Sequence, residues 1–183
     1  DGGFDFSINY DEQESLALKL IFCQIAYAIA LQKKGGTFVL KIFDIFLQSS
    51  VELIYMLSCL YKKVHIIKPN TSRYANSEKY IVCEQYKLED SSKIIKKLHS
   101  ILVVLHNMKK DEYKILSFIN FPIQCMYLDK LKEINSILGQ QQIETIASTL
   151  NLIEQLNSNY SSLLKEKNIQ KCIHWCQKTI YHI

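Results

Sequence analysis

Three charged residues at wide and similar intervals are the chemically distinctive feature of this 183-residue chain. Asp1 opens the segment DGGFDF, Lys41 lies 40 residues later in TFVLKIFD, and Glu78 lies another 37 residues on in KPNTSRYANSEKYIV. An amine flanked by carboxylates can take the proton of a hydroxyl group and hold its oxygen in place for attack on carbon. We therefore expect the three side chains to converge on one substrate atom, where Gly2 and Gly3 leave room beside Asp1.

Taken together and in this order, the three segments resemble the FtsJ-like ribose 2′-O-methyltransferases. The likeness is greater to the cap-specific mRNA enzymes of eukaryotes and large DNA viruses than to the ribosomal RNA enzymes. That family uses a Lys-Asp-Lys-Glu tetrad, and the resemblance maps Asp1, Lys41 and Glu78 onto its last three members. It implies methyl transfer from S-adenosylmethionine to a ribose 2′-hydroxyl near the 5′ cap of mRNA.

Two parts of the family pattern lie outside this resemblance, namely the first lysine of the tetrad and the glycine-rich cofactor loop. The Gly pairs of the chain are Gly2-Gly3 and Gly35-Gly36, and neither forms such a loop after a first strand. The resemblance therefore covers the C-terminal part of a methyltransferase. It implies that an N-terminal segment or chain completes the sheet and binds the cofactor, with Asp1 near that site.

Polar residues between Lys68 and Glu78 are candidates for RNA contact. Ser72, Arg73 and Asn76 belong to the motif region, and Arg73 is the only Arg among 22 basic residues. A planar guanidinium suits bidentate recognition of phosphate. Turn chemistry explains Ser72 and Asn76 almost as well, so they are either substrate-binding or scaffold residues.

Each candidate also has an ordinary interpretation, and the function has alternatives. Lys41 taken alone is a water-exposed lysine at a strand end, Glu78 a partner of a nearby cation, and Asp1 a solvated chain end. Methylation of ribosomal RNA would use the same tetrad. A noncatalytic RNA-binding or scaffolding subunit would account for the absent cofactor loop, although the joint presence of the three residues argues against it.

Composition is consistent with an intracellular domain that has one sizeable core. Hydrophobic residues make up 48% of the chain and the formal net charge is +4, which permits RNA contact without demonstrating it. The six cysteines lack the spacing of a secreted disulfide scaffold, so we expect buried thiols in a reducing compartment. That compartment is the cytoplasm or nucleus, or a viral factory or virion if the protein is viral. Cys172, His174 and Cys176 lack a second ligand cluster, and we predict no metal site. The apolar run Leu16–Leu31 is shorter than the ~20 residues of a membrane span.

Periodicity predicts an α/β fold for residues 1–88 and an all-helical extension for residues 89–183. We interpret the first part as the C-terminal half of a Rossmann-like, doubly wound sheet, and expect the helices to pack on it. Without its other half, such a sheet would expose an apolar edge. A capping-box spacing, Ser49 to Glu52, predicts the start of a helix. The predicted helices are Asp11–Lys34, Val51–Tyr61, Ile94–His106 with Asp90 or Ser91 as its N-cap, Tyr127–Leu156 and Ser161–Tyr181. The predicted strands are Thr37–Phe43, Val64–Ile67 and Lys79–Tyr86.

Overall fold

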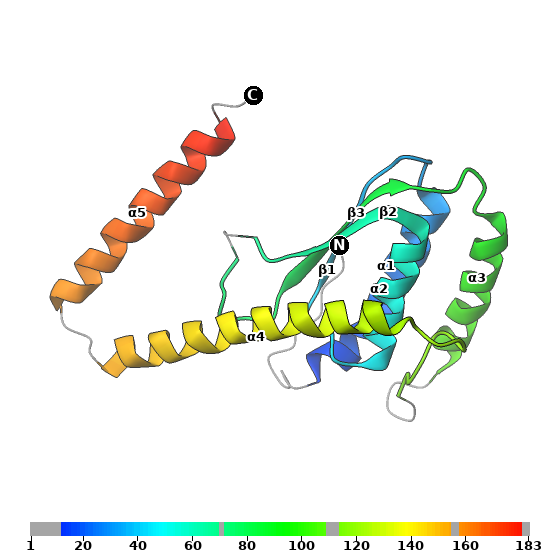
Figure 1. Cartoon of the computed structure of the whole chain (residues 1–183), viewed down its shortest axis with the longest axis horizontal. Helices are drawn as coiled ribbons and strands as arrows, with labels where there is room; N and C mark the ends of the chain where they lie inside the picture. The colour runs from blue at the N-terminus through cyan, green and yellow to red at the C-terminus, as the bar shows by residue number, and fades with distance from the viewer. Residues whose placement is uncertain (1–11, 70–71, 109–113, 155–157, 181–183) are drawn as a thin grey trace. The chain divides into compact units, whose positions relative to one another are not determined.

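A computed structural model describes residues 12–69, 72–108, 114–154 and 158–180 as a mixed α/β structure (Figure 1). Asp1 lies outside the described residues. Residues 1–142 form one compact unit and residues 143–183 a second. The elements are α1 (Gln13–Leu31), β1 (Phe38–Ile42), α2 (Gln48–Leu60), β2 (Tyr61–Ile67), β3 (Lys79–Tyr86), α3 (Ser92–Asn107), α4 (Cys125–Glu154) and α5 (Ser158–Ile180).

The sheet of the first unit has three strands in the order β1-β3-β2, and β3 is antiparallel to both neighbours. β1 and β2 are consequently parallel to each other. The carboxyl ends of β1 and β2 and the beginning of β3 meet at one edge of the sheet. There Tyr80 of β3 pairs with Lys41 of β1 on one side and with Ile67 of β2 on the other. This edge therefore gathers the segments that follow β1 and β2 and the residue that precedes β3.

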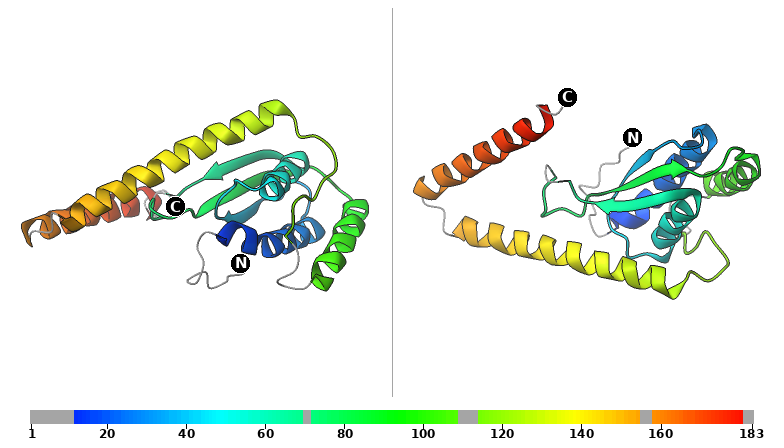
Figure 2. Two further views of the ribbon diagram at one scale, coloured as in Figure 1. Left: turned by 90° about the horizontal axis from the view of Figure 1, so that it is seen from below. Right: turned by 45° about the horizontal axis from the view of Figure 1, so that its top comes forward.

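Helices α1 and α2 lie on one face of this sheet, and α3 packs against α1 (Figure 2). Alternation along the strands turns Leu40, Ile42 and Ile81 toward these helices, where they are almost fully buried. α1 is long and apolar enough to cross a membrane by length and composition alone. Here its apolar face is part of the core, through Ala17, Leu18, Ile21, Phe22, Ile25, Ala26 and Ile29.

The opposite face of the sheet is only partly covered by the described residues. Val39, Val82 and His65 form one cross-strand row on it, and Lys41, Tyr80 and Ile67 form the next. Val39 is 56% exposed and Ile67 is 42% exposed. Apolar side chains on a β-sheet of this kind normally pack against a second layer.

A glycine turn lies between α1, which ends at Leu31, and β1. Gly35 has φ of +80°, a conformation that side chains with a Cβ rarely adopt. Its N–H donates to the carbonyl of Tyr86 at 2.8 Å, and the Tyr86 N–H donates to the carbonyl of Gly36 at 3.1 Å. Gly35 and Gly36 thus connect the turn to the end of β3.

The capping-box prediction at Ser49 and Glu52 is wrong. α2 begins at Gln48, with Leu47 as its N-cap and no side-chain cap of its own. Glu14 of α1 takes up the free N–H groups there, since its carboxylate accepts from the N–H groups of Phe46 and Leu47. Glu52 is instead 2% exposed and bonded to a segment more than 60 residues later.

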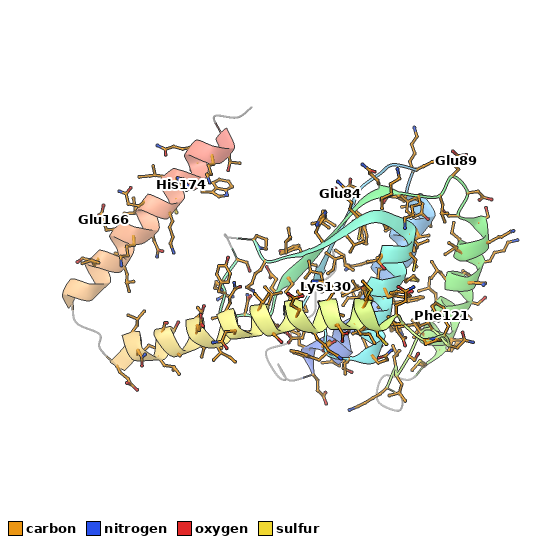
Figure 3. The ribbon with its side chains drawn as sticks, viewed as in Figure 1. Glu84, Glu89, Phe121, Lys130, Glu166 and His174 are labelled. Atoms are coloured by element: carbon orange, nitrogen blue, oxygen red, sulfur yellow. The ribbon has the colours of Figure 1, made fainter. Side chains whose placement is uncertain are left out.

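The three C-terminal helices occur as the sequence predicts, with ends that differ by a few residues. α3 contributes Leu98 and Leu105 to the core, and α4 contributes Leu131 from its second turn. Figure 3 shows Phe121 in the segment that leads to α4 and Lys130 on that helix. The α/β class is confirmed, and the proposed boundary at residue 88 stays a prediction.

Candidate active site

Lys41 and Glu78 form an ion pair at the edge of the sheet where β1 ends and β3 begins. The Lys41 Nζ lies 3.2 Å from Glu78 Oε2, and the two side chains are 34% and 22% exposed. Lys41 points to the open face of the sheet because residues on a strand alternate and Leu40 and Ile42 occupy the core face. The Nζ also lies 5.8 Å from the centre of the Phe43 ring. A half-buried amine is thus held beside a carboxylate and remains open to solvent.

The second oxygen of Glu78 accepts two further hydrogen bonds. The Tyr80 hydroxyl donates to Glu78 Oε1 at 3.1 Å, and the Ser72 hydroxyl donates to the same oxygen at 3.4 Å. Burial raises the pKa of Glu78, but the hydrogen bonds from Lys41, Tyr80 and Ser72 outweigh it, so the pKa lies below its usual range. The carboxylate is therefore ionised at neutral pH and oriented through both oxygens.

Lys68 closes the loop between β2 and β3. Its Nζ donates to the carbonyl and the side-chain oxygen of Asn76, at 2.7 and 2.9 Å, and to the carbonyl of Glu78 at 2.8 Å. Burial lowers the pKa of Lys68, and the nearby Lys79 lowers it further against the opposing effect of Glu78. The side-chain oxygen of Asn76 also accepts a hydrogen bond from the Glu78 N–H at 3.3 Å, so Asn76 stabilises the loop from within.

Lys79, on the core face of β3, fixes the segment that follows β1. It is 5% exposed, and its Nζ donates to Asp44 Oδ1 at 3.1 Å and to the carbonyls of Phe43 and Ser77 at 3.2 and 2.9 Å. A buried ammonium needs such partners because desolvation disfavours an unpaired charge. The pair joins the loop after β1 to the loop before β3.

Of the predicted site residues, the structure brings together Lys41, Glu78 and Ser72. Arg73 lies on the same loop and is exposed. Sequence reasoning missed Tyr80 and the anchoring role of Lys68. Tyr80 could have been found from alternation, because it lies two residues after Glu78 and so shares its face of β3.

A groove of about 630 Å³ lies between α1 and β1 and has Lys41 among its lining residues. One wall is the outward side of α1, with Leu20, Tyr27 and Leu31, and the other is the sheet, with Val39 and Tyr80. Tyr27 is 69% exposed and Leu31 is 81% exposed. The groove is therefore an apolar channel with Lys41 among its lining residues.

The glycine-rich loop expected for S-adenosylmethionine is not found among the described residues. The family binds it with a glycine-rich loop after a first strand, whereas Gly35 and Gly36 are engaged in the turn before β1. Within the described ranges, no group of three His, Cys, Asp or Glu residues is placed to hold a metal ion. The arrangement can hold a hydroxyl group at the Lys41 nitrogen, which accepts the hydroxyl proton when the amine is neutral.

Comparison with known proteins shows a similar family and similar individual proteins. The model of the FtsJ-like methyltransferase family matches residues 1–86. The chain is 33% identical over 94% of its length to mouse cap-specific mRNA (nucleoside-2′-O-)-methyltransferase 2, and 36% identical over 91% to the zebrafish protein of that name. It is 36% identical over 78% of its length to Drosophila melanogaster cap-specific mRNA (nucleoside-2′-O-)-methyltransferase 1. The chain spans 22%, 22% and 19% of these three relatives, about a fifth of each. Residues 1–86, which carry the Lys41–Glu78 pair, are therefore similar to the FtsJ-like methyltransferase domain.

Proposed function

We propose that this chain is the part of a cap-specific 2′-O-methyltransferase that holds the reacting ribose hydroxyl. The observation that supports it most is the pairing of Lys41 and Glu78 at 3.2 Å, because these residues are 37 positions apart and match two members of the family tetrad. Asp1, outside the described residues, is the third member in this proposal. The matched relatives carry names that specify capped mRNA and 2′-O-methylation.

Each described residue has a defined part in the proposed reaction. Lys41, as a neutral amine, receives the proton of the 2′-hydroxyl while the oxygen attacks the methyl carbon, whose bond to sulfur breaks. The ammonium that results pairs with Glu78, which keeps Lys41 aimed at that oxygen. Tyr80 and Ser72 hold Glu78 from its other side. S-adenosylmethionine, when bound, supplies the methyl group. Positioning of this kind can lower a barrier by about 7 kcal/mol or more.

RNA contact is proposed for the loop between β2 and β3. Arg73 is exposed on this loop and suits a phosphate group, while Ser72 and Asn76 set the shape of the loop around it. Lys68 places the loop beside Glu78. A phosphate bound by Arg73 would thus lie near the proposed ribose site.

We also propose that an upstream segment fills the groove beside β1 and covers the open face of the sheet. Two observations support this: in the described part of the chain β1 is an edge strand, and the groove next to it is lined by exposed apolar side chains. A strand paired with β1 would satisfy its free backbone groups. Such a segment would complete a Rossmann-like sheet and bring the cofactor loop and the first lysine of the tetrad. The proposed setting is the cytoplasm or the nucleus, where mRNA is found.

A noncatalytic RNA-binding subunit and a ribosomal RNA methyltransferase remain the alternatives. The first is favoured by the lack of a cofactor loop among the described residues, and the second uses the same ion pair. The names of the matched relatives favour capped mRNA over ribosomal RNA.

The test is methyl transfer from labelled S-adenosylmethionine to capped and uncapped RNA by the protein with its upstream sequence present. Lys41→Ala should lower the rate at least 100-fold, the lower range for loss of an acid–base group. Lys63→Ala is the matched control, since Lys63 is an exposed lysine on the same sheet face, opposite Glu84. Equal methylation of capped and uncapped RNA would contradict the cap assignment. RNA binding without transfer would support the noncatalytic subunit.

A further inference from the structure

Helix α4 crosses the edge of the sheet at which the proposed site lies. It runs past the ends of β1 and β2, and its residues up to Gln142 belong to the same compact unit as the sheet (Figure 1). Leu131 is buried, and Ile134 and Leu138 are partly buried on the same side of the helix. The helix is therefore docked by an apolar stripe in its first half.

Two amide side chains continue this docked face and bond to loops of the site. Asn135 Nδ2 donates to the carbonyl of Ile45 at 2.7 Å, and Gln142 Nε2 donates to the carbonyl of Ala75 at 3.3 Å. The two amides are seven residues apart, so they lie on one face of the helix two turns apart. Each contacts a different loop, the first after β1 and the second between β2 and β3.

The two loops are those that carry the polar groups around the ion pair. Ile45 follows Asp44, whose carboxylate pairs with buried Lys79. Ala75 lies between Arg73 and Asn76, and Asn76 is bonded to Lys68. An amide of α4 thus bonds to a backbone carbonyl of each loop.

The position of α4 is itself fixed by a buried carboxylate. Glu52 of α2 accepts from the N–H groups of Phe118 and Ile119 and from the hydroxyl of Ser117, in the segment that leads into α4. α2 begins directly after the loop that Asn135 contacts. Contacts therefore link four parts of the chain in turn. The loop after β1 leads into α2, α2 bonds to the segment before α4, and α4 bonds back to the loop after β1.

We propose that Asn135 and Gln142 are positioning residues for RNA recognition, through which α4 holds the two substrate-facing loops in their binding conformation. The role in RNA recognition rests on the proposed function, whereas the role of the two amides in holding the loops does not. Gln142 holds the loop that carries Arg73. Loss of the Gln142 hydrogen bond therefore raises the KM for RNA more than it lowers kcat. Asn135 holds the loop of Asp44.

The test combines hydrogen exchange with kinetics in the full-length protein. Gln142→Ala should speed amide exchange in residues 72–78 about fivefold, the effect of one lost hydrogen bond, and raise the KM for capped RNA by a similar factor. Asn135→Ala should do the same for residues 44–47. Ser136→Ala is the matched control, because Ser136 is the exposed neighbour of Asn135 on the same helix.

Gln142→Glu keeps the size of the side chain and removes its N–H donor, so it should reproduce the faster exchange even if the alanine variant folds poorly. Exchange in residues 72–78 that stays at the Ser136→Ala value in both Gln142 variants would overturn the proposal. Faster exchange with no methyl transfer by the unaltered protein would support the holding of the loops and refute the proposed function. Faster exchange with an unchanged KM and a lowered kcat would overturn the assignment to RNA recognition.

Discussion

At Tyr80, a hydroxyl group bonds the same carboxylate that pairs with Lys41. The Tyr80 OH lies 3.1 Å from Glu78 Oε1, while Lys41 Nζ lies 3.2 Å from Oε2. Burial raises the pKa of Tyr80, as do its hydrogen bond to Glu78 and the charge of that carboxylate. The phenol therefore keeps its proton at neutral pH and can act only as a donor to Glu78 in this pairing.

Removing this hydroxyl should change the acid side of the pH–rate profile. In Tyr80→Phe, Glu78 loses one of the donors that hold its pKa below the usual range, so this pKa rises. Activity that needs the ionised carboxylate should then fall at a higher pH during acidification than in the unaltered protein. The measurement is kcat/KM for methyl transfer between pH 4 and 8.

The control for this prediction is Tyr55→Phe, which makes the same chemical change on α2. Tyr55 packs with its ring against Tyr127 and Phe121, away from the ion pair. If the pH at which kcat/KM falls on acidification shifts equally in both variants, or in neither, the proposed role of the Tyr80 hydroxyl is contradicted.

Among the elements, the contact between α2 and the segment before α4 depends on one buried carboxylate. Glu52 is 2% exposed, and it accepts from the N–H groups of Phe118 and Ile119 and from the side chains of Ser117 and Gln48. Burial raises its pKa, but these hydrogen bonds outweigh the effect and leave the pKa below the usual value. Charged acceptors with several donors make stronger bonds than neutral ones.

Glu52→Gln should lower the free energy of unfolding by about 1–3 kcal/mol, because the neutral amide loses the charge-assisted bonds and places N–H groups against N–H donors. The contribution of an acid whose pKa is lowered by folding is present above its unfolded pKa and disappears as the pH falls through the folded value. The difference between the two proteins should therefore shrink on acidification. Urea unfolding at pH 7 and at low pH measures it.

Glu12→Gln provides the comparison, because Glu12 is an exposed acid at the start of α1. It should change the free energy of unfolding little at either pH. A Glu52→Gln protein as stable as this control would mean that the backbone segment 117–119 is held by other contacts.

Local pattern predicted the elements well because the signals lie within a few residues of each other. α1 ended at Leu31, three residues before the predicted end, and the β-branched and aromatic residues of Phe38–Ile42 formed a strand. β2 begins at Tyr61, three residues before the prediction, because pairing of Tyr61 with Tyr86 extends the strand right up to the end of α2. Such pairing has no signature near Tyr61 itself.

The capping box and the α4 contacts show which features a single sequence hides. Glu52 has the spacing of a helix cap, but its partners lie 65 to 67 residues away in the chain. Asn135 and Ile45 are 90 residues apart. The Lys41–Glu78 pairing could be anticipated only because its motif spacing resembles a known family, whereas Lys68 and Lys79 act through backbone carbonyls that the sequence does not mark.

For the molecule as a whole, the buried core lies entirely within residues 17–131 of the described chain. On α5, the large apolar side chains Leu163, Ile169, Ile173 and Trp175 are 44–55% exposed. This helix therefore adds little buried apolar area to the described structure.

Ending the protein at Glu154, which keeps α4 whole, should leave its melting temperature within about 2 °C of the full-length value, as expected when less than about 0.5 kcal/mol is lost. Ending it at Gln124 should lower the melting temperature much more, because Leu131 and the Asn135 contact are lost with α4. Thermal unfolding followed by circular dichroism distinguishes the two. A large loss in the longer of the two proteins would show that α5 stabilises the core.

The strand order has a consequence for how the protein folds. β2 and β3 are neighbours in sequence, whereas β1 is separated from β3 by α2 and β2. Contacts between residues far apart in sequence form slowly because a long loop must first be closed. Since Lys41 and Glu78 belong to the pairing of β1 with β3, we expect the ion pair to be absent from early folding intermediates and to appear only when the three strands are in register.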